Sequence, residues 1–185
     1  MIQEKKSTLS SFLDLPFLEY QTIEKDNWVL YMLSVRLEDY WKLVSKESGD
    51  LRRYLFDSGG WDFLWLIQIN EEKARTLANP ADNWSLNNGV TIIVTNATVL
   101  GKTIQLQDIQ IINGLKPTKI IYHHFQGDSA TSKDRILLVQ IIVPSDAQIR
   151  DQIIEAASYQ GQPVTIIDLQ AICNAQNSLR YRGDS

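Results

Sequence analysis

An almost unbroken apolar run over residues 136–143, ended by Pro144, constrains the fold of this chain more than any other feature. The run has the length of a strand, and strands buried on both faces carry continuous apolar sequence instead of an alternating pattern. It therefore predicts a central strand of a sheet that is covered on both sides. Proline cannot donate to a strand ladder, which is why we expect the strand to end there.

Helical patterns are predicted on both sides of this strand. Ser145-Asp146-Ala147-Gln148 has the spacing of a capping box, so we expect a helix to begin there. Pro117 suits the first turn of a preceding helix, and Thr165-Ile166-Ile167-Asp168 opens a further one. A fourth helix is predicted earlier, after residue 36, and each of the four has an apolar face that we expect to be buried. In chain order, these faces are Leu37, Tyr40, Trp41 and Val44 in the helix after residue 36; Ile120, Ile121, His124 and Phe125 in the helix at Pro117; Ile149, Ile153 and Ala156 in the helix after Pro144; and Leu169, Ile172 and Cys173 in the last helix.

Further strands are predicted over residues 28–34, 63–69 and 90–99, and a short helix over residues 71–77. Leu100-Gly101-Lys102 is a tight turn that returns the chain as a hairpin over residues 103–106. Beyond it, apolar residues shift from even to odd positions at Gln107-Asp108, which predicts a bulge or a break between two strands. Since strands and helices alternate, we expect an α/β (α+β) fold, with a mixed β-sheet and packed helices in a single, possibly incomplete domain.

Composition excludes several classes of protein. The 185 residues suffice for about one domain, and 44% of them are hydrophobic, which excludes a disordered chain. A single cysteine and two histidines exclude a disulfide scaffold and a Cys2His2 zinc site, so we expect no metal and no cofactor. A net charge of -4 argues against non-specific clamping of nucleic acid. No apolar run has the length of a membrane helix, so we expect a cytoplasmic protein without membrane contact.

Three polar turns lie beside apolar strands, at residues 87–89, 113–118 and 158–160. Asn and Gly tolerate left-handed backbone, so each turn could serve chain reversal alone. The second has a sharper interpretation, because a strand that ends in Asn-Gly directly before a helix exposes backbone N–H groups that bind anions. The candidate ligand-binding residues are Asn87, Asn88, Gly89, Asn113, Gly114, Lys116, Thr118 and Gln160.

No arrangement of residues indicates catalysis. His123 and His124 are neighbours on a predicted helix, point about 100° apart and cannot serve one site. His124 falls on the apolar face, which favours a buried structural histidine. No acidic cluster has the spacing of metal ligands, so a metal-dependent nuclease is disfavoured, and the sequence leaves open whether the chain is an enzyme.

Several ordered segments together resemble one protein family. The similar segments are Tyr31-Met32-Leu33-Ser34-Val35, Leu51-Arg52-Arg53-Tyr54-Leu55, Trp84 followed by Asn87-Asn88-Gly89-Val90-Thr91-Ile92, Ile109-Gln110-Ile111-Ile112-Asn113-Gly114, residues 139–143, Arg150-Asp151-Gln152-Ile153-Ile154-Glu155-Ala156, and Gln162-Pro163-Val164. Over residues 28–175 the chain is similar to the AIPR (abortive infection phage resistance) proteins of bacteria. The resemblance divides the chain into an N-terminal segment 1–27, an AIPR-like α/β region 28–175 and a C-terminal tail 176–185 that we expect to be frayed.

The chain departs from the family pattern at two places. Lys116-Pro117-Thr118 stands where the family usually carries Gln-Thr-Thr, and the stretch before Gln162 is one residue longer and lacks an Asn. Family members are also several hundred residues long, so the resemblance implies a truncated copy of their central region.

Two functions remain open from the sequence. The resemblance and the polar turns favour a phage-defence protein, or a fragment of one, that binds nucleotide or nucleic acid beside the central strands. The departures favour instead a non-catalytic remnant or a protein-interaction module with no ligand of its own. A partner protein or a homo-oligomer is compatible with either.

Overall fold

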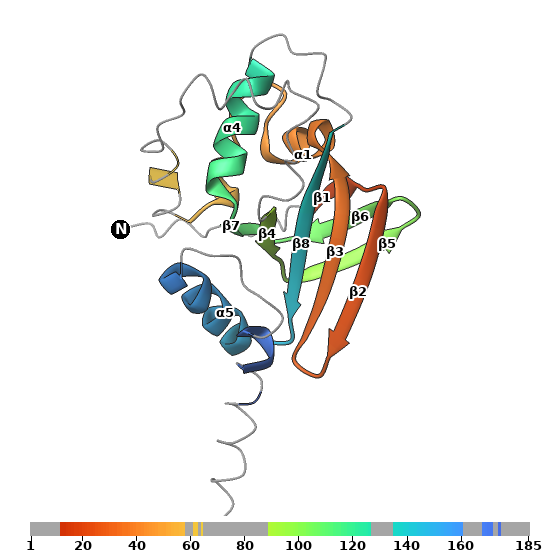
Figure 1. The fold of residues 1–185 in the computed structure, drawn as a ribbon, viewed down its shortest axis with the longest axis vertical. Coiled ribbons are helices and arrows are strands. Elements are labelled where there is room, and N and C mark those ends of the chain that lie inside the picture. The colour runs from red at the N-terminus through yellow and green to blue at the C-terminus, as the bar shows by residue number, and fades with distance from the viewer. Residues whose placement is uncertain are drawn as a thin grey trace, which may run out of the picture.

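The computed structural model describes residues 12–57, 89–126 and 135–160, with residues 61, 62, 64, 168–171 and 174. Two β-sheets and the helices packed on them make up this part of the chain (Figure 1). The predicted α/β (α+β) class with a mixed sheet is therefore confirmed. The helix expected over residues 71–77 lies outside the described residues. The strand expected over residues 63–69 is wrong at Leu64, which is helical.

The larger sheet has five strands in the order β2-β3-β8-β4-β7. Its middle strand is β8 (Ile136–Pro144), which pairs antiparallel with β3 (Trp28–Arg36) and parallel with β4 (Val90–Ile93). The edges are β2 (Glu19–Lys25) and β7 (Gln110–Asn113), both antiparallel to their neighbours. The prediction that the apolar run over residues 136–143 forms the central strand is confirmed.

The expectation that β8 is buried on both faces is wrong for its first half. Ile136 and Leu138 are 41% and 47% exposed, whereas Leu137 and Val139 beside them are buried. The cause is the position of α5 (Ala147–Gln160), which covers the sheet only near the far end of β8, where Ile142 is buried under it. An apolar run thus reports where a strand lies in a sheet, but not how far along the strand each face is covered.

The smaller sheet has the order β1-β6-β5 and is antiparallel throughout. The hairpin of β5 (Asn96–Leu100) and β6 (Thr103–Gln107) turns at Gly101 as predicted, and β1 (Phe12–Pro16) pairs with its second strand. The single strand predicted over residues 90–99 is two strands in different sheets. The chain changes sheet at Val94 and Thr95, whose backbone N–H groups donate to Ile142 and Gln107 respectively.

The shift in apolar parity at Gln107-Asp108 is a break between strands, as expected. Asp108 has a positive φ of 53°, and β7 begins two residues later. This reversal carries the chain from the smaller sheet back to the edge of the larger one. It therefore fixes where Asn113 and Gly114 lie.

The helices begin close to the predicted positions. α1 (Leu37–Val44) follows β3 without a loop, and α4 (Leu115–Gln126) holds Pro117 in its first turn. At α5 the N-terminal cap is Asp146, not Ser145, because the Asp146 carboxylate accepts the Ile149 N–H at 2.9 Å. The buried face of α5 includes Ala157, whereas the predicted Ala156 is not part of the core. Leu169, in the short helical stretch beyond, is buried as predicted.

Two hydrophobic clusters hold the layers together. The larger one lies between one face of the five-stranded sheet, α1, α4 and the three-stranded sheet; the smaller one joins the opposite face to α5 through Trp28, Leu30, Ile142, Ile149 and Ile153. Figure 1 shows α1 and α4 near each other and α5 apart from both. Among the described residues, no helix is long and apolar enough to cross a membrane.

Candidate functional site

Two glycines bring separate polar turns to one edge of the five-stranded sheet. Gly89, directly before β4, and Gly114, directly after β7, both have positive φ, at 58° and 100°. A Cβ atom built on Gly114 would lie 3.1 Å from the Gly89 carbonyl oxygen and 2.9 Å from Cα of Val90. We call Gly89 and Gly114 the glycine pair. Only glycine permits both this backbone conformation and this close approach.

The glycine pair places Asn113 and the first turn of α4 together. Asn113 is half-buried, pairs with Thr91 across the strands, and its side-chain amide bonds to no other described residue. Lys116 is the second residue of the helix and is exposed. In the described part of the chain no acceptor meets the backbone N–H groups of Leu115 and Lys116. We call Gly89, Asn113, Gly114 and Lys116 the turn site.

Thr118 lies beneath the turn site and is fully buried. Its hydroxyl donates to the Gly114 carbonyl oxygen at 2.7 Å, and the Tyr40 hydroxyl lies 2.7 Å from the same Thr118 oxygen. Burial raises the pKa of Tyr40 well above its usual value, so its phenol stays protonated. Because the single Thr118 hydroxyl hydrogen is directed to Gly114, the Tyr40 hydroxyl is the donor to Thr118. Thr118 thus ties the start of α4 to Gly114 and to α1. No sequence pattern predicts Tyr40 as its partner, since the two residues are 78 positions apart.

The charged groups of α4 near the turn site are basic. Lys119 is buried one turn beyond Lys116, and burial lowers its pKa. Burial likewise lowers the pKa of the His123 imidazole, and the Lys119 charge lowers it further. Lys116, Lys119 and His123 are three and four positions apart and so lie along one side of the helix. Lys119 is buried and the lowered pKa favours the neutral imidazole of His123, so Lys116 is the one of these three groups that presents a full charge to solvent.

His124 is buried, as its place on the apolar face predicts, and contacts Phe125 edge to face with ring centroids 5.3 Å apart. It takes no part in the turn site. Among the described residues, no three of the types His, Cys, Asp and Glu gather closely enough to hold a metal ion.

The remaining candidates from the sequence lie outside the described residues. These are Asn87, Asn88 and the side chain of Gln160. Of the first polar turn, Gly89 is the described residue, and it lies at the turn site. The structure thus brings together Gly89, Asn113, Gly114 and Lys116, and sets Thr118 behind them in the interior.

The AIPR protein family model matches residues 52–181, which is more than half of the chain. The chain belongs to the AIPR family. The match to AIPR proteins includes β4, β7, α4, β8 and α5, and with them the whole turn site. Neither a curated protein nor a solved structure is detectably similar to this AIPR chain.

The glycine pair predicts a large cost for one methyl group in this AIPR protein. Gly114→Ala adds a Cβ 2.8 Å from Cγ2 of Val90, at a φ that L-residues rarely adopt, so we expect a loss of about 2–4 kcal/mol in the free energy of unfolding. Gly49→Ala is the matched control, because Gly49 has a similar φ of 87° in open space. It should cost about 1 kcal/mol. Urea unfolding measures both, and equal losses would contradict the close packing.

The buried histidine predicts a pH dependence of stability in this AIPR chain. Burial lowers the pKa of His124, and the Arg135 charge lowers it further. Below about pH 6.5 the unfolded chain therefore binds a proton at His124 more readily than the folded chain, and stability falls as the pH falls. His124→Gln should reduce the loss measured by urea unfolding between pH 7.5 and 5.5, and should reduce it more than His123→Gln. An unchanged loss in His124→Gln would refute this assignment.

Proposed function

We propose that this AIPR-family chain acts in bacterial defence against phage and binds a nucleotide or nucleic acid at the turn site. Family membership supports the biological role, since the family is that of abortive infection phage resistance. The geometry of the turn site supports the ligand class. No bond-breaking step is proposed at this site.

One observation carries the binding proposal, namely the packing of Gly114 against Gly89 and Val90. Without it, two polar turns 25 positions apart in the sequence would each be an ordinary chain reversal. With it, Asn113, Lys116 and Gly89 share the end of the sheet where β4 begins and β7 ends. Both glycines are buried, so they hold the two backbone segments together and leave the ligand contacts to Asn113, Lys116 and the first N–H groups of α4.

The chemistry at this edge suits a phosphate group. The N–H groups of Leu115 and Lys116 lie at the positive end of the α4 dipole, where anions are stabilised. The Lys116 ammonium adds a full charge, and the Asn113 amide can donate to a phosphate or to the edge of a base. Pro117 follows in the same turn and has no N–H, so this arrangement provides few donors and one flexible cation.

Two substitutions test the proposal. Lys116→Ala should weaken the binding of ATP or of a 12-nucleotide single strand about tenfold, because it removes a charge-assisted contact to phosphate. Asn113→Ala should weaken it by several-fold, while both variants unfold at the same urea concentration as the parent. Fluorescence polarisation with labelled nucleotide, DNA and RNA measures the affinities, and Lys25→Ala, at the tip of the β2–β3 hairpin, is the matched control.

Unchanged affinity in both variants would contradict the turn site as the binding site. Absence of any binding to the parent at millimolar ligand would contradict the ligand class. The second result would favour the other candidate, a protein-interaction module without a ligand of its own. The observation that supports this second candidate is the exposure of Ile136 and Leu138 on the uncovered half of the sheet.

A further inference from the structure

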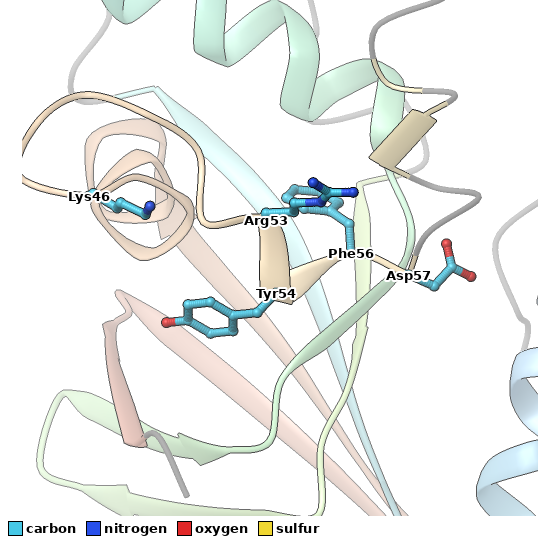
Figure 2. A pocket seen from close by; sticks show the side chains of 5 residues that line it. All are labelled: Lys46, Arg53, Tyr54, Phe56 and Asp57. Carbon is cyan, nitrogen blue, oxygen red and sulfur yellow. The ribbon is translucent and has the colours of Figure 1, made fainter. Parts of the chain in front are cut away.

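An open pocket of about 440 Å³ lies away from the turn site, next to the 3-10 helix η1 (Arg53–Leu55). Figure 2 shows Lys46 at one side, Asp57 at the opposite side, and Arg53, Tyr54 and Phe56 between them. Its size falls in the range of pockets that hold small ligands. Arg53 and Tyr54 belong to one of the segments that resemble the AIPR family, but no sequence pattern groups them with Lys46 or Asp57.

The backbone around the pocket is held firmly by neighbouring elements. The segment after α1 closes on itself through a bridge between Ser45 and Leu51, and the Arg52 N–H donates to the Val44 carbonyl at 2.7 Å. The Arg52 side chain also donates to the Leu43 carbonyl at 3.2 Å. Leu55 and Phe56 are buried in the core. Arg53 and Tyr54 are therefore presented outward on a fixed support.

The pocket combines two basic side chains with an exposed aromatic ring. Within the described residues no carboxylate pairs with the Lys46 ammonium or with the Arg53 guanidinium, which lies 5.5 Å from the centroid of the Trp61 ring. The Tyr54 side chain is 53% exposed and lies outside the core. Cations beside an exposed aromatic ring are the combination that binds a phosphate together with the adjoining base.

We propose that this pocket binds a nucleotide unit, with Lys46 and Arg53 on the phosphate and Tyr54 stacked on the base. The ligand is a free nucleotide or one unit of a single strand, since both present a phosphate next to a planar ring. Asp57 lies at the end of the pocket opposite Lys46 and its carboxylate is directed away from the Tyr54 ring, so it is assigned no contact with the ligand. One carboxylate alone does not favour a metal ion in this pocket.

This site is distinct from the turn site, so the inference goes beyond the proposed function and can fail separately. The pocket residues come from the α1–η1 segment, whereas the turn site is built by β4, β7 and α4. η1 packs against β7, so both sites border the same edge of the sheet. Each is testable with variants that leave the other intact.

Fluorescence polarisation of a labelled 12-nucleotide oligothymidylate, with ATP as competitor, tests the inference on the full chain. Tyr54→Ala should weaken binding about tenfold through loss of stacking, and Tyr54→Phe should retain the parent affinity. Lys46→Ala with Arg53→Ala should weaken binding by at least tenfold and reduce its dependence on salt. Each of the changed side chains lies outside the core, including that of the control Lys25→Ala. The temperature of thermal unfolding should therefore be the same in all of these variants as in the parent.

Two further measurements identify the source of the ligand and the site that binds it. Competition by micromolar ATP would assign a free nucleotide, whereas resistance to millimolar ATP would assign a single strand. Photocrosslinking of 4-thiothymidine within the oligonucleotide, followed by peptide mapping, should label the peptide that contains Tyr54. Parent affinity in Tyr54→Ala and in the Lys46/Arg53 variant, or labels confined to the peptide that contains Asn113, would overturn the inference and leave the turn site standing. Labels at Tyr54 alone would overturn the turn site instead.

Discussion

The described fold depends on the close parallel pairing of β4 with β8. Four buried residues of β4 lie between the central strand and β7, so the edge of the sheet and the start of α4 are both positioned through them. Gly89 makes the approach possible, because a side chain there would overlap the carbonyl oxygen of Leu138. Gly114 allows an equally close approach on the other side of β4, where it packs against Val90. The two glycines thus set the spacing of three strands at one end of the sheet.

The sequence predicted those features that depend on local pattern. The apolar run over residues 136–143 is the central strand, the face of α1 is buried at Leu37, Tyr40 and Val44, and the hairpin at Gly101 lies where the turn residues put it. Local pattern failed where distant contacts decide the outcome. The exposure of Leu138 depends on where α5 ends its coverage, and the break at Val94 depends on the second sheet. The strands β1 and β2 were not predicted, because neither shows a clear apolar alternation.

The candidate site divides in the same way. Asn113, Gly114 and Lys116 were found from the sequence because a strand, a turn and a helix follow one another there. The convergence of Gly89 on Gly114, and the inward bond of Thr118 to Tyr40, required the fold. The Lys46–Arg53–Tyr54 pocket was missed because its residues are individually ordinary for an exposed segment. Both proposed sites border β7, which makes this edge of the AIPR fold the region where we expect its ligand contacts.

The most direct test of this account is amide chemical-shift mapping by NMR on the ¹⁵N-labelled chain, titrated with ATP and with the oligothymidylate. The account predicts that the amides of Gly89, Gly114, Leu115 and Lys116 shift together and saturate at one ligand concentration, because one packed edge carries them. Shifts that leave all four amides unchanged, while others saturate elsewhere on the sheet, would contradict it.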